Sequence, residues 1–227
     1  IRDSLIALID NLYPGTKIYN LDIVENNHEG KSTYINCDVR SEINIDIPVT
    51  SEDVIFNFAA VHRTPGHPDQ AYFETNIRGA ENVCAFAEKF GIKKIVFTSS
   101  IAPYGAAEDL KTEETLPTPN TPYGISKLVA EKIHTIWQAK KLNERQLTIV
   151  RPGVVFGKGE NGNFTRLYWG IRGGKFFYPG RKDTIKACIY VKELVRFMLY
   201  RLENHSEGVE LYNCTFESAF TIEQIVE

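Results

Sequence analysis

Two segments of this 227-residue sequence carry side chains whose types and spacing suit acid–base chemistry. The hydroxyl-rich run Thr98-Ser99-Ser100 follows an apolar stretch, and Tyr123 precedes Lys127 by four positions. Side chains four residues apart share one face of a helix, so Lys127 can place its ammonium near the Tyr123 phenol. A free tyrosine has a pKa of about 10, and a neighbouring cation favours its phenolate. The pair therefore predicts a general base at Tyr123, with a serine hydroxyl orienting a substrate oxygen.

The Tyr-x-x-x-Lys spacing occurs three times in the chain, and only its context separates the three copies. The copies at 13–17 and 178–182 run through Pro-Gly, which favours a turn over a helix. Tyr123 instead follows Thr121, a capping residue, and Pro122, which suits the first position of a helix. We therefore predict that the Tyr123 copy alone is held on one helical face.

The spacing of apolar residues predicts helices and strands that alternate along the chain and position these residues. Strands separated by long helical stretches imply crossover connections and a parallel sheet that is covered on both faces. The predicted fold class is α/β, a doubly wound parallel sheet of the Rossmann type with a smaller C-terminal lobe. The predicted helices cover 5–12, 69–90 and 122–141, and the predicted strands cover 17–22, 33–37, 53–58, 94–98 and 146–150.

The character of the sequence changes after Arg151-Pro152, where glycine, asparagine and proline become frequent and the periodic signals become short. We expect residues 1–152 to form the main α/β domain. Residues 153–227 are expected to form mainly the smaller lobe, with segments near 184–200 returning to the sheet.

The composition excludes several classes of protein. Hydrophobic residues make up 43% and charged residues 24%, as in globular domains. A net charge of −3 provides no basic field for nucleic acid or anionic lipid, and no apolar run is long enough for a membrane span. The four cysteines form no C-x-x-C pair. We therefore expect a cytoplasmic protein with reduced thiols, no metal, no nucleic-acid partner and no membrane span.

Carboxylates follow two of the predicted strands, at the sheet edge where α/β proteins bind their ligands. Asp22 can accept hydrogen bonds from both ribose hydroxyls of an adenine nucleotide and would repel a 2′-phosphate, which favours NAD over NADP. An ordinary turn aspartate is the alternative. Asp38 can similarly take the adenine amino group. The literal G-x-G-x-x-G at 157–162 has its following acid, Asp183, in a polar turn and not at a strand end, and Glu160 would repel a pyrophosphate, so we interpret the segment as a loop over the substrate.

Seven groups of residues match, in order and in spacing, the extended short-chain dehydrogenase/reductases. The chain most resembles their NAD-dependent epimerase/dehydratase family of nucleotide-sugar enzymes, over roughly residues 1 to 200. The matching groups are Tyr19–Asp22, Cys37–Val39, Asn57–Ala60, Asn76–Gly79, Thr98–Ser100 with Tyr104-Gly105, Pro122–Lys127, and Arg151-Pro152 with Phe156-Gly157.

The resemblance implies a dinucleotide-binding domain at 1–152 that holds NAD, and a lobe at 153–227 that binds the nucleotide sugar. Ser100, Tyr123 and Lys127 would be catalytic, and Ser100, Asn163 and Lys186 would contact the substrate. A solvated basic turn is the alternative for Lys186. The implied cofactor contacts are Asp22, Ile23, Asp38, Val39, Phe58, Ala59, Ala60, Asn76, Thr98, Tyr123, Lys127, Pro152 and Val155.

The sequence departs from the family pattern at its two ends. The family's first strand and glycine-rich turn do not precede Ile1, which reads as part of the first helix. Residues 221–227 read as the beginning of a helix. We therefore expect the first strand and its glycine-rich turn to be missing from this chain.

The resemblance leaves three activities open. A 4-epimerase would use Tyr123 to take the proton of the sugar's 4-hydroxyl while C4 gives a hydride to NAD, and the hydride would return to the other face. An NAD(P)-dependent 4-keto-sugar reductase uses the same side chains. A catalytically silent nucleotide-binding protein is the third reading, although such relatives usually lose the tyrosine or lysine. We take the 4-epimerase as the first hypothesis, and the resemblance also implies a homodimer through the helices at 69–90 and 122–141.

Overall fold

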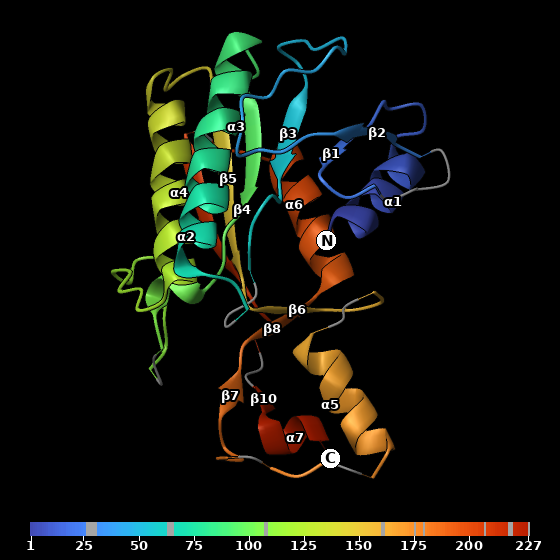
Figure 1. Ribbon diagram of the computed structural model, residues 1–227, viewed down its shortest axis with the longest axis vertical. Coiled ribbons are helices and arrows are strands. Elements are labelled where there is room, and N and C mark those ends of the chain that lie inside the picture. The colour runs from blue at the N-terminus through green and yellow to red at the C-terminus, as the bar shows by residue number, and fades with distance from the viewer. Residues whose placement is uncertain are drawn as a thin grey trace.

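A four-stranded parallel sheet, in the order β3-β4-β5-β9, forms the centre of the computed structural model (Figure 1). A separate parallel pair joins β1 to β2. The predicted parallel α/β architecture is therefore confirmed. The strands are β1 (Tyr19–Asp22), β2 (Thr33–Asn36), β3 (Val54–Asn57), β4 (Lys94–Thr98), β5 (Gln146–Pro152) and β9 (Val209–Cys214). The structure describes residues 1–25, 31–62, 66–106, 109–159, 162–174, 176–178, 180–206, 208–217 and 220–226, without the side chain of Asn163.

Strand β4 is buried on both faces, which explains its continuous apolar sequence. Ile95 and Phe97 pack into one hydrophobic cluster and Val96 into another, each with about 1% of its surface exposed. Alternate side chains of one strand therefore serve two different layers of the molecule.

Helices cover both faces of the sheet (Figure 1). One layer contains α3 (Arg78–Lys89) and α4 (Pro122–Ala139), whose Ala87, Ala130 and Trp137 pack with the cluster of Ile95. The other layer contains α6 (Val191–Glu203), whose Leu194 and Met198 pack with Val96. Helix α1 (Arg2–Leu12) packs against α6 through Leu5.

The helix predicted at 69–90 is interrupted near its start. It consists of α2 (Asp69–Tyr72), a π-helical turn at Phe73–Ile77, and α3. The π turn holds the buried Asn76, whose Oδ1 accepts from the Val61 amide at 2.8 Å and whose Nδ2 donates to Ser126 Oγ at 2.8 Å. Widened turns of this kind occur mostly inside longer helices and often at functional sites.

A smaller lobe lies beyond one end of the sheet, at the bottom of Figure 1. Strand β6 leaves the main sheet directly after β5 and pairs with β8, while β7 pairs with β10. Strand β9, which was not predicted, returns to the main sheet beside β5. The remaining elements are a 3₁₀ helix at Ala102–Tyr104, β6 (Val154–Phe156), α5 (Asn163–Arg172), β7 (Ile185–Lys186), β8 (Cys188–Tyr190), β10 (Phe220–Thr221) and α7 (Ile222–Val226). No helix in the described part of the chain is long and apolar enough to cross a membrane.

Candidate active site

The start of α4 places Tyr123 beside the turn that follows β4. Thr121 caps the helix, because its Oγ1 accepts from the Gly124 amide at 3.1 Å, and Pro122 takes the first position. A Cβ on Gly124 would lie 2.6 Å from the carbonyl oxygen of Ala102, so only glycine permits this approach. The helix therefore begins in direct contact with the segment that carries Ser100.

The structure brings the side chain of Ser100 close to the phenol of Tyr123. Burial raises the pKa of the Tyr123 phenol, and the neighbouring Ser100 hydroxyl opposes that rise. Ser100 Oγ also accepts from the Ala102 amide at 3.2 Å, which leaves its proton free to be donated. The lowering of the Tyr123 pKa by Lys127 stays a prediction.

Lys127 lies one helical turn further along α4 and is almost completely buried. Its Nζ donates to the Thr98 carbonyl at 2.6 Å, at the end of β4, and lies 4.3 Å from the centre of the Phe97 ring. Burial lowers the pKa of Lys127 to about 7, while the nearby carboxylate of Glu131 acts in the opposite direction. An ammonium with this pKa can give up and regain its proton near neutral pH.

A buried ion pair between Glu131 and Arg151 lies under the site. Arg151 on β5 donates to both oxygens of Glu131, at 2.8 and 2.6 Å, and the two side chains are only 4% and 3% exposed. Ser99 Oγ donates to the same carboxylate. Sequence reasoning missed Glu131, although the four-residue spacing of Tyr123, Lys127 and Glu131 on one helix places them on a shared face.

His134 continues the buried polar face of α4, and it was also missed. Its Nδ1 donates to the Ala130 carbonyl at 2.7 Å, because a carbonyl can only accept, so Nε2 accepts from Asn57 Nδ2 at 3.2 Å. Asn57 Oδ1 in turn accepts from the Ala59 amide at 3.2 Å. His134 therefore fixes the backbone that follows β3.

The buried His134 predicts a pH-dependent stability. Burial lowers its pKa from 6.5 to about 4, so the folded chain keeps it neutral while the unfolded chain takes up a proton below pH 6.5. Stability is therefore lost as the pH falls from 6.5 towards 4. Between pH 7 and pH 5, the free energy of unfolding should fall by about 2 kcal/mol more for the parent chain than for His134→Gln, as measured by urea titration.

His67→Gln, at an exposed histidine, is the matched control and should retain the parent's pH dependence. Parallel pH profiles for the parent chain and His134→Gln would contradict the assignment.

Two carboxylates predicted to bind the adenosine part of NAD lie beside each other at the ends of β1 and β2. The Cys37 amide, directly before Asp38, donates to the Asp22 carbonyl at 3.1 Å. The Asp22 carboxylate accepts from the Arg2 guanidinium and from the Val24 amide. The Arg40 guanidinium hydrogen-bonds to Asp38 at 2.6 Å and lowers the pKa of that carboxyl.

Several other predicted cofactor residues also follow strand ends. Ile23 is exposed after β1, and Phe58, Ala59 and Ala60 are half-buried after β3. Val39 packs so closely on α3 that a Cβ on Gly79 would lie 2.9 Å from it. Asn76 supports this edge indirectly, through the backbone of Val61.

The predicted site residues in the C-terminal part of the chain are divided between the main sheet and the lobe. The Pro152 carbonyl accepts from the Ile101 amide at 3.2 Å, next to Ser100, and Val155 follows on β6. Lys186 is exposed on the β7–β10 pair of the lobe. Asn163 begins α5, and its side chain lies outside the described residues.

Comparisons with known proteins identify relatives of this chain. The model of the NAD dependent epimerase/dehydratase family matches residues 7–215. N-acetyl-alpha-D-glucosaminyl-diphospho-ditrans,octacis-undecaprenol 4-epimerase of Escherichia coli O157:H7 is 36% identical over 219 residues, which are 96% of this chain and 66% of that protein. UDP-glucose 4-epimerase of Bacillus subtilis (strain 168) is 29% identical over 178 residues, which are 69% of this chain and 52% of that protein.

Solved structures share the fold. UDP-glucuronic acid 4-epimerase from Bacillus cereus, in complex with NAD, superposes with a TM-score of 0.83 over 98% of this chain and 76% of that chain, at 19% identity. The chain spans less than two thirds of the length of the two curated relatives, at 66% and 52%.

Proposed function

Because this chain belongs to the NAD dependent epimerase/dehydratase family, we propose that it acts as an NAD-dependent 4-epimerase of sugars joined to a diphosphate. Nucleotide sugars are the first substrate class we propose. The observation that carries the proposal is the proximity of Ser100, which follows β4, to Tyr123 at the start of α4, with Lys127 one turn further along the same helix. Relatives named for 4-epimerisation of sugar diphosphates support it.

The residues at the sheet edge fit NAD. The carboxylate of Asp22, at the end of β1, has the acceptor chemistry that ribose hydroxyls need. Ala59 and Ala60 leave space for a flat ligand against the backbone after β3. Thr98 Oγ1 is buried without a hydrogen-bond partner among the described residues, at the strand end expected to face the nicotinamide. When bound, NAD supplies the hydride acceptor and donor for C4 of the sugar.

The chain's own residues then move the proton. The Tyr123 phenolate takes the proton from the sugar's 4-hydroxyl as the C4–H bond gives up its hydride, so that C4 becomes a ketone. Ser100 donates a hydrogen bond to the same sugar oxygen and holds it against Tyr123. The Lys127 ammonium stabilises the phenolate. When the hydride returns to the opposite face of C4, Tyr123 gives the proton back, and no net oxidation occurs.

Isotope labelling of the sugar tests this function. We expect the full chain, with NAD at a small fraction of the sugar concentration, to convert UDP-[4-²H]glucose to the C4 epimer and to retain deuterium at C4. Nuclear magnetic resonance of the product and absorbance of reduced cofactor measure both quantities. In a parallel reaction that contains NADH and a 4-keto sugar, stoichiometric consumption of NADH would instead identify a reductase.

We also propose how the chain divides its roles. Residues 1–152 would bind the dinucleotide, and residues 153–227 would mainly bind the substrate. Asp22 and Asp38 at the ends of the β1–β2 pair, and Tyr123 beside the turn after β4, support the first assignment. The separate β6–β8 and β7–β10 pairs support the second.

A homodimer through the layer of α3 and α4 and a cytoplasmic location complete the proposal. Ile125 and Ile136 expose apolar surface on α4, at 39% and 60%, which supports a partner on that layer. Free cysteines support a reducing compartment, and burial raises the pKa of Cys84 and Cys214 to about 12.

A further inference from the structure

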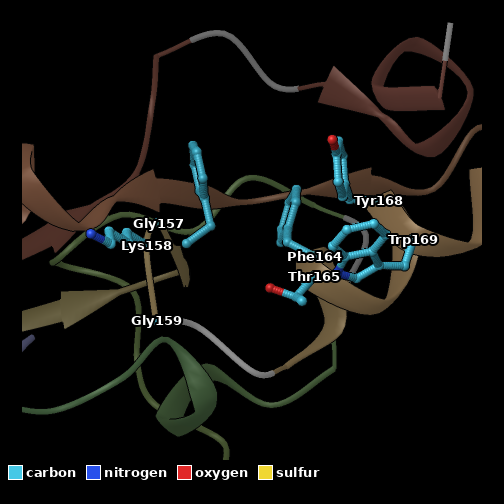
Figure 2. A pocket seen from close by; sticks show the side chains of 8 residues that line it. Gly157, Lys158, Gly159, Phe164, Thr165, Tyr168 and Trp169 are labelled. Atoms are coloured by element: carbon cyan, nitrogen blue, oxygen red, sulfur yellow. The ribbon is translucent and has the colours of Figure 1, made fainter. Parts of the chain in front are cut away.

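An aromatic hollow of about 520 Å³ lies between the end of β6 and helix α5 (Figure 2). A cavity of this size is typical of small-molecule sites. It is lined by Phe156, Lys158, Phe164, Thr165, Tyr168 and Trp169, together with two glycines. None of these residues was assigned to the acid–base machinery.

Among the residues that the structure describes, the lining combines aromatic rings with the hydroxyl of Thr165 and one cation, Lys158. Phe156 and Phe164 stack at 5.3 Å between ring centres, and Tyr168 and Trp169 meet edge to face at 5.2 Å. Tyr168 and Trp169 are 53% and 59% exposed, which is unusual for rings of this size. Among the described lining residues, Lys158 carries the charge, and none has a carboxylate or carboxamide.

The cation and the outermost rings lie on different sides of the hollow. Figure 2 shows Lys158 extending away from Tyr168 and Trp169, which gather over α5. Arg172 donates to the Tyr168 hydroxyl at 3.0 Å and holds that ring in place. This separation matches a ligand with an anionic group at one end and an apolar chain at the other.

Strand β6 connects the hollow to the candidate active site. Pro152, two residues before it, accepts through its carbonyl a hydrogen bond from the Ile101 amide beside Ser100. Val154–Phe156 then covers about 10 Å at the rise of an extended strand. If the sugar of a sugar diphosphate lies at Ser100, the group attached to the other end of the diphosphate would therefore extend towards Phe156.

We propose that the hollow binds the isoprenoid chain of a polyprenyl-diphosphate sugar, with the diphosphate on the side of Lys158. Aromatic rings remove an isoprenoid chain from water, whereas a nucleobase also needs polar groups that pair with its edges. The inference rests on the proposed 4-epimerase, because that function supplies the sugar, and it extends the substrate class from nucleotide sugars to lipid-linked sugars.

Tryptophan fluorescence provides a direct test, because the chain has two tryptophans and Trp137 is buried at 2% exposure. In a Trp137→Phe background, the emission reports Trp169. We expect farnesyl diphosphate to shift this emission to shorter wavelength and to saturate, and UDP and inorganic diphosphate to leave the wavelength unchanged. Trp169→Ala should weaken farnesyl diphosphate binding at least about tenfold in calorimetry on the otherwise unchanged chain.

Tyr200→Ala is the control, since Tyr200 is 55% exposed on α6, outside the hollow, and should leave the affinity unchanged. A shift with UDP as large as that with farnesyl diphosphate, or an affinity that Trp169→Ala does not alter, overturns the proposal. Either result leaves Tyr123-dependent epimerisation of UDP-sugars intact. Failure of the 4-epimerase would instead appear as absent turnover while farnesyl diphosphate still binds.

Discussion

Tyr123→Phe is expected to lower kcat for 4-epimerisation by about 10²- to 10⁴-fold, with a small change in KM. The substitution keeps the ring but removes the hydroxyl that lies beside Ser100. Without that oxygen, the 4-hydroxyl proton has no acceptor at the end of β4. Steady-state kinetics with a UDP-sugar and NAD measure the effect, and circular dichroism checks that the variant is folded.

Tyr13→Phe is the matched control, because it alters another Tyr-x-x-x-Lys copy. Tyr13 ends α1 and is followed by the Pro-Gly turn, so its hydroxyl has no place in the site. Its kcat should equal that of the parent. Retention of parent-level turnover by Tyr123→Phe would remove the acid–base role from this residue.

Glu131→Gln is expected to lower the free energy of unfolding by about 3 to 5 kcal/mol. The glutamine cannot neutralise Arg151, whose side chain is only 3% exposed, so a charge would remain buried without its counter-ion. It also weakens the acceptor used by Ser99. Urea unfolding followed by circular dichroism measures the change, provided that the slope with denaturant stays constant.

A Glu→Gln substitution in an exposed ion pair shows how much of the stability loss comes from burial and how much from removal of the charge alone. Glu193 bonds Arg196 at 2.9 Å with both side chains at least half exposed, so Glu193→Gln should cost less than about 1 kcal/mol. Replacing both Glu131 and Arg151 by methionine should cost less than Glu131→Gln alone, because no unpaired charge remains. Equal losses for Glu131→Gln and Glu193→Gln would refute this explanation.

Local sequence patterns predicted most helices and strands of the main domain. The apolar run of β4 and the capped start of α4 depend on neighbours in sequence, and both form where expected. The context of Tyr123 also separated it from the copies at 13–17 and 178–182. Such features follow from short-range propensity and periodicity, which a single sequence contains.

Features that depend on distant partners escaped prediction. Glu131 meets Arg151 from another element, and His134 meets Asn57 across 77 positions, so neither pairing leaves a local signal. The π turn at Phe73–Ile77 interrupts a sequence that reads as one continuous helix. Strand β9, at one edge of the main sheet, contains the buried Glu210, which pairs with Arg201 and interrupts the apolar pattern of the strand.

The inner face of α4 is anchored to three different strands of the sheet. Lys127 bonds to the end of β4, Glu131 to β5 and His134 to β3. A shift of α4 by one turn along its axis would leave all three of these buried groups without their hydrogen-bond partners. Purely apolar contacts could re-form after such a shift. These polar contacts therefore fix the position of α4 along its own axis. The sequence of the lobe's loops can change without moving the hydroxyls of Ser100 and Tyr123.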